Sequence, residues 1–210
     1  IEPLSSGSAG FQPATRARCP RSQTDARIES SAALNPLALY VHWPYCARVC
    51  PYCDFNVVRA RGRVDEEAAL VRAILADIAG QAERLEGPRR LVSIFFGGGT
   101  PSLMPPQAAA AIAETANRLF EPAADLEITL EANPTDAEAA RFAGFAEAGV
   151  ERLSLGVQAL DDASLAFLGR NHDAGEARRA AEVAAKLFPR LSLDLIYARP
   201  GQTPPAWAAE

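Results

Sequence analysis

The stretch Leu91-Val92-Ser93-Ile94-Phe95-Phe96-Gly97-Gly98-Gly99-Thr100 joins a short apolar run directly to a glycine-rich turn. Apolar runs of this length that are rich in β-branched and aromatic residues are typical of strands buried in parallel sheets. After Pro105-Pro106, apolar side chains recur at three- and four-residue steps up to Leu119, which indicates a helix. The stretch is therefore predicted to begin a strand–turn–helix unit.

Similar units lie on both sides of this one. Apolar runs predict further strands at residues 37–41, 126–130, 152–157 and 191–196. Helical patterns cover residues 65–85, 135–149, 161–169 and 174–187, and Thr135 with Glu138 is expected to form a capping box. Five strand–helix alternations imply a parallel sheet with right-handed crossovers.

An open doubly wound sheet and a (β/α) barrel both satisfy this alternation, and the polar residues favour the barrel. Each predicted strand carries polar or reactive residues at or just after its carboxyl end: Cys46, Gly97–Thr100, Glu131 with Asn133, Gln158 and Asp194. In a barrel all these ends meet at one mouth, whereas in an open sheet they spread along an edge. We predict an α/β fold, a partial (β/α) TIM-like barrel that ends after about five strands.

The two ends of the chain do not fit the pattern. Residues 1–36 show no helical or strand periodicity, so we expect a disordered N-terminal extension there, with a transit peptide as the open alternative. Residues 37–210 are predicted to be the core domain. Because the chain starts with Ile1 and stops soon after a fifth strand, we expect this domain to lack its C-terminal part.

Composition and charge exclude several classes of protein. With 21 Lys and Arg against 26 Asp and Glu, the net charge of −5 argues against general nucleic-acid binding. No apolar run approaches the roughly 18 residues that cross a membrane. Four cysteines, three of them clustered, do not suit a disulfide scaffold, which favours a reducing compartment such as the cytoplasm.

The cluster Cys46-x3-Cys50-x2-Cys53 directly follows the first predicted strand. Three thiolates within eight residues suit a [4Fe–4S] cluster in which one iron has no protein ligand. Zinc is the first alternative, but zinc takes four ligands and only His42 and Asp54 stand nearby. Metal-free thiols are the second, and Cys19 is expected to take no part.

Here the sequence resembles a known family. The pattern Tyr40-x-His42-x-Pro44-x-Cys46-x3-Cys50-x-Tyr52-Cys53, followed by Gly97-Gly98-Gly99-Thr100-Pro101, resembles the radical S-adenosylmethionine (SAM) enzymes, within them the oxygen-independent coproporphyrinogen III oxidase group. The resemblance covers about residues 37–205. It implies a [4Fe–4S] cluster on Cys46, Cys50 and Cys53 whose open iron is chelated by SAM. It further implies an electron donor and reductive cleavage of SAM to a 5′-deoxyadenosyl radical.

The resemblance also implies which residues contact SAM. Tyr40, Tyr52, Gly98, Gly99, Thr100 and Glu131 match contacts of a first SAM, and Gln158, Arg170 and Asp194 match contacts of a second one. Glycine would let the backbone approach the ligand. Taken alone, the glycine run is also explained by a tight turn, and Arg170 could instead pair with Asp161 or Asp162. His42 is open to a purely structural role, and His172 is expected to be a loop residue and not a heme ligand.

One departure favours a branch of the group. The oxidases carry one more cysteine two residues after the third, where this chain has Phe55. The form Cys50-Pro51-Tyr52-Cys53-Asp54-Phe55-Asn56 is instead similar to the heme chaperones of the HemW type, which carry heme as cargo and deliver it to heme-accepting proteins. The oxidase, which makes a porphyrin precursor by oxidative decarboxylation, remains the alternative.

Overall fold

The predicted strands pair side by side in chain order. In the computed structural model, which describes residues 34–210, all five are parallel and lie in the order β1 (Asn35–Trp43), β4 (Arg89–Gly98), β5 (Glu121–Ala132), β6 (Arg152–Gln158) and β7 (Arg190–Leu195). The prediction for Cys19 lies outside the described residues, as does that for the extension up to residue 33. Since β1 starts at Asn35, the last two residues of the predicted extension belong to the sheet.

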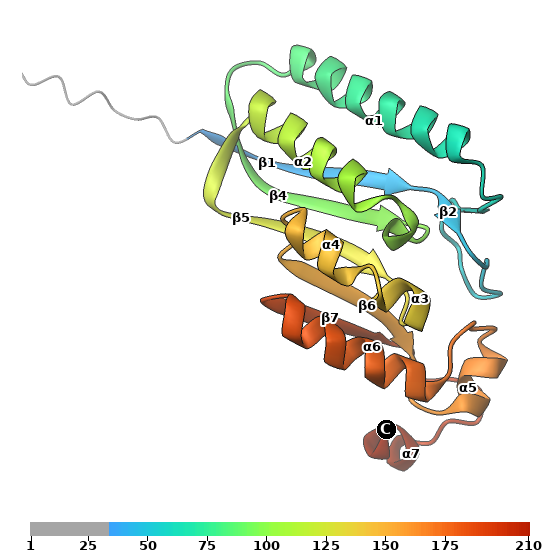
Figure 1. Cartoon of the computed structure of the whole chain (residues 1–210). Coiled ribbons are helices and arrows are strands. Elements are labelled where there is room, and N and C mark those ends of the chain that lie inside the picture. Colours follow the sequence, from blue (N-terminus) through green and yellow to red (C-terminus); the bar gives the residue numbers. More distant parts are fainter. Residues whose placement is uncertain (1–33) are drawn as a thin grey trace, which may run out of the picture. The chain divides into compact units, whose positions relative to one another are not determined.

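The helices that connect these strands lie on one face of the sheet. Figure 1 shows α1, α2, α4 and α6 along the same side of the strands. The helices are α1 (Val64–Arg84), α2 (Pro106–Leu119), α3 (Asp136–Ala139), α4 (Phe142–Glu147), α5 (Asp162–Phe167), α6 (Ala174–Leu187) and α7 (Pro204–Ala209). A sheet with sequential strand order and right-handed crossovers puts every helix on one side, as in a barrel, whereas a doubly wound sheet uses both. The partial barrel is confirmed.

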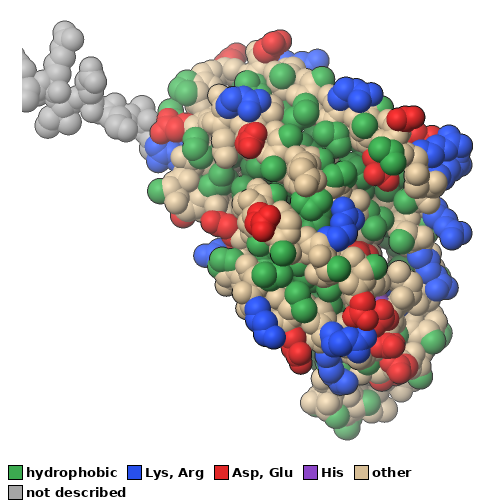
Figure 2. Space-filling model, in the orientation of Figure 1, with side chains coloured by type: hydrophobic (Ala, Val, Ile, Leu, Met, Phe, Trp, Pro, Cys, Tyr) green, Lys and Arg blue, Asp and Glu red, His purple; other side chains and the backbone are tan. Residues whose placement is uncertain are grey.

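The two faces of the sheet differ in chemistry because side chains alternate along each strand. In β6, Leu153, Leu155 and Val157 are buried in the main core against the helices. Their neighbours Ser154 and Gln158 are less buried and face the other way. One face therefore supplies the hydrophobic core and the opposite, inner face carries polar groups. Figure 2 shows the helical side, where charged side chains are scattered over the outer helix surfaces.

The segment predicted as one helix over 135–149 forms two. The backbone leaves the helix between α3 and α4, where the Arg141 guanidinium donates to the Met104 carbonyl at 2.5 Å. Thr135 caps α3 by accepting from the Glu138 amide at 3.2 Å. The capping box is wrong in its second half, because the Glu138 carboxylate accepts from the Asn133 amide and the Ser102 hydroxyl instead.

Two short elements hold the turns at the carboxyl ends of the strands. The strands β2 (Tyr45–Cys46) and β3 (Val58–Arg59) pair in parallel and close the segment that carries the cysteines. A 3-10 turn over Pro101–Leu103 follows the glycine run. Neither was predicted. Within residues 34–210, no helix is both long and apolar enough to span a membrane.

Candidate functional site

The carboxyl ends of the strands surround one cavity. The cavity is open to solvent. Eleven of the twelve predicted site residues line it: Cys46, Cys50, Tyr52, Cys53, Gly98, Gly99, Thr100, Glu131, Gln158, Arg170 and Asp194. Residues from six separate segments of the sequence therefore meet at one place.

The cysteine loop, residues 46–53, is held at both ends by backbone hydrogen bonds. The Ala60 amide donates to the Cys46 carbonyl at 2.7 Å, and the Cys53 amide donates to the Cys50 carbonyl at 3.1 Å. Cys46 is buried, whereas Cys50 and Cys53 are partly exposed. Burial raises the pKa of the Cys46 thiol, and the nearby Cys53 and Cys50 raise it further, while a hydrogen bond with Thr100 opposes them.

The arrangement of the three thiols bears on which metal group they fit. Among residues 34–210, no three His, Cys, Asp or Glu side chains stand close enough to hold one metal ion. All three thiols nevertheless face the same cavity. Sulfurs bound to three different irons of a cube are farther apart than ligands of one ion, and thiolate is the usual ligand of such clusters. The donor set therefore fits a [4Fe–4S] cluster.

His42 is not placed as a fourth ligand for zinc. Its Nε2 is hydrogen-bonded to the Asn56 carbonyl at 3.0 Å, and its Nδ1 lies 3.3 Å from the Tyr40 hydroxyl. Both ring nitrogens thus have protein partners, and the ring links β1 to the segment after the cysteine loop. The geometry supports the structural role.

The glycine run packs onto the backbone that leads into the cysteine loop. The Gly99 and Thr100 amides donate to the carbonyls of Trp43 and Tyr45 at 2.7 and 2.9 Å. A Cβ on Gly99 would lie 2.7 Å from the Tyr45 carbonyl oxygen. Gly98 has φ +112°, a conformation that favours glycine. Internal packing alone thus requires glycine here, in addition to the expected approach of a ligand.

Two carboxylates face the cavity from neighbouring strands. Glu131 accepts a hydrogen bond from the Gly98 amide at 3.2 Å, and burial raises the pKa of this carboxyl despite that bond. Asp194 accepts from the Ser154 hydroxyl at 3.0 and 3.2 Å. The apolar sequence of its strand suggests a buried position for Asp194, but the side chain lies exposed on the inner face.

Arg170 joins three parts of the site. Its guanidinium donates to Cys50 Sγ and to the Tyr52 hydroxyl, both at 3.2 Å, and to the Gly156 carbonyl at 2.9 Å. The predicted alternative, a pair with Asp161 or Asp162, is wrong, because these carboxylates accept from backbone amides at helix starts. Arg170 Nε is buried without a partner in the described part of the chain. Such a donor suits a bound ligand.

Tyr52 shares this contact and lines the cavity. Its side chain is 41 % exposed. Partial burial raises the pKa of its hydroxyl to about 12, although Arg170 opposes this. The phenol is therefore neutral at physiological pH and acts as a hydrogen-bonding group with an apolar ring face.

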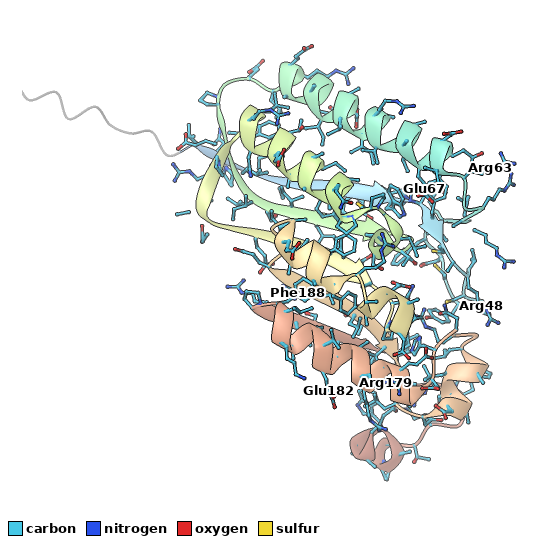
Figure 3. The ribbon with its side chains drawn as sticks, in the orientation of Figure 1. Arg48, Arg63, Glu67, Arg179, Glu182 and Phe188 are labelled. Carbon is cyan, nitrogen blue, oxygen red and sulfur yellow. The ribbon has the colours of Figure 1, made fainter. Side chains whose placement is uncertain are left out.

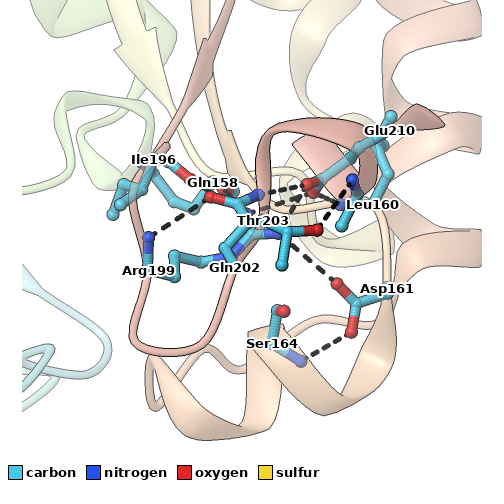
Figure 4. Close-up of polar contacts among 10 residues, drawn as sticks. Gln158, Leu160, Asp161, Ser164, Ile196, Arg199, Gln202, Thr203 and Glu210 are labelled. Atoms are coloured by element: carbon cyan, nitrogen blue, oxygen red, sulfur yellow. Dashed lines mark hydrogen bonds and ion pairs between the residues drawn. The ribbon is translucent and has the colours of Figure 1, made fainter. Parts of the chain in front are cut away.

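Gln158 reaches the cavity with an unusual backbone. Its φ is +70°, which a non-glycine residue rarely adopts. Figure 4 shows the contacts that surround it. The Gln158 carbonyl accepts from the Ile196 amide at 2.9 Å and from Arg199 at 3.5 Å. Arg199 is itself buried in an ion pair with Glu210, whose carboxylate also accepts from the Leu160 amide at 2.8 Å. Strained residues held this firmly concentrate at functional sites.

The comparisons with known proteins agree with this geometry. The family model described as the radical SAM superfamily matches residues 40–208. This chain belongs to the radical SAM superfamily. Members of the superfamily in general bind a [4Fe–4S] cluster and SAM.

Individual relatives place the chain within the superfamily. Over 191 residues it is 47 % identical to the cattle (Bos taurus) protein "Radical S-adenosyl methionine domain-containing protein 1, mitochondrial", with 90 % of this chain and 42 % of the relative covered. The Escherichia coli heme chaperone HemW is 42 % identical over 171 residues, with 81 % and 45 % covered. The solved E. coli coproporphyrinogen III oxidase is 28 % identical with a TM-score of 0.73, covering 84 % and 40 %. The chain spans less than half the length of each of these relatives.

One predicted site residue of the radical SAM chain lies outside the cavity. Tyr40 is 57 % exposed, stacks on Phe95 with ring centroids 6.1 Å apart, and contacts His42. It lies on the inner face of β1 but does not line the cavity. The structure does not bring it to the other eleven residues.

The radical SAM cavity also has lining residues that were not chosen as site residues. They are Arg48, Val49, Phe55, Ala132, Asn133, Ser154, Gly156 and Asn171. Ser154 and Gly156 share the face of Gln158, which the period of two along a strand could have indicated. Figure 3 labels Arg48 on the cysteine loop, beyond the carboxyl ends of the strands.

The second histidine has a structural position. His172 is buried and its Nε2 donates to the Val157 carbonyl at 3.0 Å. It is absent from the residues that line the cavity. His172 thus lies in the segment between α5 and α6, as expected of a loop residue, with its ring bonded to β6.

Proposed function

We propose that this protein is a HemW-like heme chaperone that holds a [4Fe–4S] cluster through Cys46, Cys50 and Cys53 and binds SAM beside it. The observation that carries the proposal is the single cavity shared by the three thiols and the carboxyl ends of β4, β5, β6 and β7. When bound and reduced, a cluster of this kind supplies an electron for cleaving SAM.

The residues of the cavity would bind and orient the nucleotide. Glu131 presents a carboxylate to the methionyl amine or the ribose, and Tyr52 presents its ring to the adenine. Gln158 of β6, Asp194 of β7 and Arg170 from the segment after α5 line the same cavity. They are the residues expected to contact a second SAM. Gly98, Gly99 and Thr100 form the wall beside Cys46. Tyr40 would contact SAM only from the neighbouring inner face.

Two comparisons bear on the choice between chaperone and oxidase. The chain is 42 % identical to the E. coli heme chaperone and 28 % identical to the oxidase of that organism. Phe55, which stands where the oxidases carry a cysteine, is 63 % exposed at the cavity mouth. Because this position lacks the thiol of the oxidases, we favour binding and transfer of heme over decarboxylation of a porphyrinogen. Heme, heme-accepting proteins and an electron donor for the cluster are the partners that this function requires.

The relatives come from more than one compartment. The thiol cluster requires a reducing compartment, for which the cytoplasm was predicted. Relatives from cattle and mouse carry the word mitochondrial in their names, whereas the E. coli relative is bacterial. We propose a reducing compartment, with cytoplasm and mitochondrion to be distinguished by cell fractionation.

Anaerobic reconstitution with iron and sulfide tests the cluster. The wild-type chain is expected to turn brown and, after reduction, to give the electron paramagnetic resonance signal of a [4Fe–4S]⁺ cluster that shifts when SAM is added. Cys46→Ser, Cys50→Ser and Cys53→Ser should each abolish the signal, and Cys19→Ser serves as the matched control. A colourless wild-type chain that binds one zinc ion instead would overturn the assignment.

The choice between chaperone and oxidase is tested on the full-length protein. Incubation with reductant, SAM and coproporphyrinogen III should leave the porphyrinogen unchanged, while heme binds in stoichiometric amount and passes to an acceptor protein. Formation of protoporphyrinogen would establish the oxidase instead.

A further inference from the structure

Glu138 is a buried carboxylate with no role in the cavity described above. It is 4 % exposed, and it takes part in none of the ion pairs within residues 34–210. Its carboxylate accepts from the Asn133 amide at 2.9 Å and from the Ser102 hydroxyl. Burial raises the pKa of the carboxyl, and these hydrogen bonds oppose that effect. Burying a carboxylate is unfavourable unless it is hydrogen-bonded, so these two donors are what keep Glu138 in its place.

Asn133, which Glu138 holds by its backbone, uses both ends of its side chain on other segments. Its Oδ1 accepts from Arg170 at 2.5 Å, and its Nδ2 donates to Thr100 Oγ1 at 3.0 Å. Neither Arg170 nor Thr100 is close to Asn133 in the sequence. The amide therefore ties the end of β5 to the glycine run and to the segment after α5.

Each of these two partners holds the cysteine loop or the residue that leads into it. Arg170 donates to Cys50 Sγ and to the Tyr52 hydroxyl, both at 3.2 Å. The Thr100 amide donates to the carbonyl of Tyr45, directly before Cys46, at 2.9 Å, and Thr100 and Cys46 line the same cavity.

We propose that Asn133 and Glu138 are positioning residues that hold the cysteine loop in its binding conformation: Glu138 fixes the Asn133 backbone, and the Asn133 side chain fixes Arg170 against Cys50 and Thr100 against Tyr45, the residue before Cys46. The proposal rests on the proposed function only for the identity of the group that the loop receives. The link acts in the metal-free chain, so it prepares the loop before a cluster is loaded.

Hydrogen–deuterium exchange of the metal-free chain tests the link. Asn133→Leu removes both side-chain bonds at nearly constant volume. Amide exchange in residues 48–56 and 168–173 should become about fivefold faster, the factor expected for losing one such bond. Exchange in α2 should not change. Asn117→Leu, on the exposed face of α2, is the matched control and should leave the loop as in the wild type.

Three further variants separate the parts of the link. Asn133→Asp keeps the acceptor for Arg170 but turns the other arm into an acceptor, so exchange in 48–56 should stay within about twofold of the wild type. Glu138→Leu should loosen the loop as Asn133→Leu does, and it provides the test should Asn133→Leu fail to fold. Glu138→Gln retains an acceptor for the Asn133 amide, so its loop exchange should match that of the wild type. Glu147→Gln, at an exposed position of α4, is the control.

Cluster retention gives an independent readout. After reconstitution, Asn133→Leu should lose iron to a chelator about fivefold faster than Asn117→Leu. Loop exchange equal in Asn133→Leu and Asn117→Leu would overturn the proposal, and so would a rise spread evenly over the core strands and α2, which indicates general destabilisation. If the wild type takes up no cluster, the proposed function fails, whereas the exchange experiment on the metal-free chain still decides this inference.

Discussion

Gly99 illustrates how a single residue links packing to the site. A Cβ at this position would lie 2.7 Å from the Tyr45 carbonyl oxygen and 2.9 Å from Pro44 backbone atoms, none of which can rotate away. Gly99→Ala should therefore lower the free energy of unfolding by about 1–3 kcal/mol, as overpacking does. Because the same backbone leads into Cys46, cluster retention should fall as well. Urea denaturation of the metal-free chain measures the first effect.

The matched control for this variant lies on α1. Gly80 has no atom within 4 Å of an added Cβ, and it stands inside a regular helix. Gly80→Ala should stabilise the chain by up to about 1 kcal/mol, because alanine favours helix. Equal stability of the two alanine variants would contradict the packing argument for Gly99.

His172 gives the chain a pH dependence whose sign follows from burial. Burial, and next the charge of Arg170, lower the pKa of His172 in the folded chain below its usual value of about 6.5. Below that pH the unfolded chain binds a proton that the folded chain does not, so stability falls as the pH is lowered. His172→Gln should remove this part of the loss, which amounts to at most about 1.4 kcal/mol per pH unit. Urea denaturation measures the free energy of unfolding of the wild type and of His172→Gln between pH 7.5 and 5.5. If both free energies fall equally over this range, the prediction is contradicted.

At the level of elements, α4 and α5 end in the same motif but in different surroundings. Gly149 and Gly169 both have positive φ, and each is followed by an amide that donates back into its helix. An added Cβ meets nothing at Gly149, whereas at Gly169 it would lie 2.7 Å from Pro51 Cδ in the cysteine loop. The end of α5 thus packs directly on the loop that carries the thiols.

Because of this difference, a glycine-to-alanine substitution should have different effects at positions 149 and 169. Gly149→Ala should reduce stability by about 1–2 kcal/mol through its backbone alone and leave cluster retention unchanged. Gly169→Ala should show the same backbone effect, a further loss from the contact with Pro51, and faster release of iron to a chelator. Equal iron release from the two variants would show that α5 does not support the loop.

The elements also show what a sequence can and cannot predict. Strands such as 152–157 and the helix 174–187 follow from local patterns and caps, and the structure confirms them within a residue at each end. The ladder of β2 with β3 is two residues long and joins segments twelve residues apart, so no local pattern indicates it. The predicted helix over 135–149 divides into two. Arg141 bonds to the Met104 carbonyl and Glu138 to the Ser102 hydroxyl, and only the tertiary structure brings these partners close.

The same distinction holds for the site. Parallel strands present their carboxyl ends together, so topology indicates Cys46, the glycine run, Glu131, Gln158 and Asp194. Cys50 and Cys53 follow from the cysteine spacing, whereas Tyr52 and Arg170 follow from the family resemblance. Asn133 also stands at a strand end, but its function depends on Arg170, 37 residues later. Tyr40 was expected at the cavity from motif resemblance, yet its strand position two residues before His42 leaves it beside Phe95.

Across the whole described chain, stability and binding are divided between the two faces of one sheet. Ser154 and Leu155 are neighbours in β6 but point in opposite directions. Leu155 is fully buried in the main core, so Leu155→Ala should lower the free energy of unfolding by about 2–5 kcal/mol. Ser154 faces the cavity and binds only Asp194, so Ser154→Ala should change stability by no more than about 0.5 kcal/mol.

Binding should respond in the opposite way. Without the Ser154 hydroxyl, the Asp194 carboxylate loses the one side-chain donor it has in residues 34–210, and the affinity of the reconstituted chain for SAM should fall about fivefold. Leu155→Ala, studied well below its unfolding midpoint, should bind SAM as the wild type does. Calorimetric titration together with urea denaturation measures both quantities on each variant. If Ser154→Ala binds SAM normally while Leu155→Ala does not, the inner face is not the binding face, and the cavity at the strand ends loses its assignment.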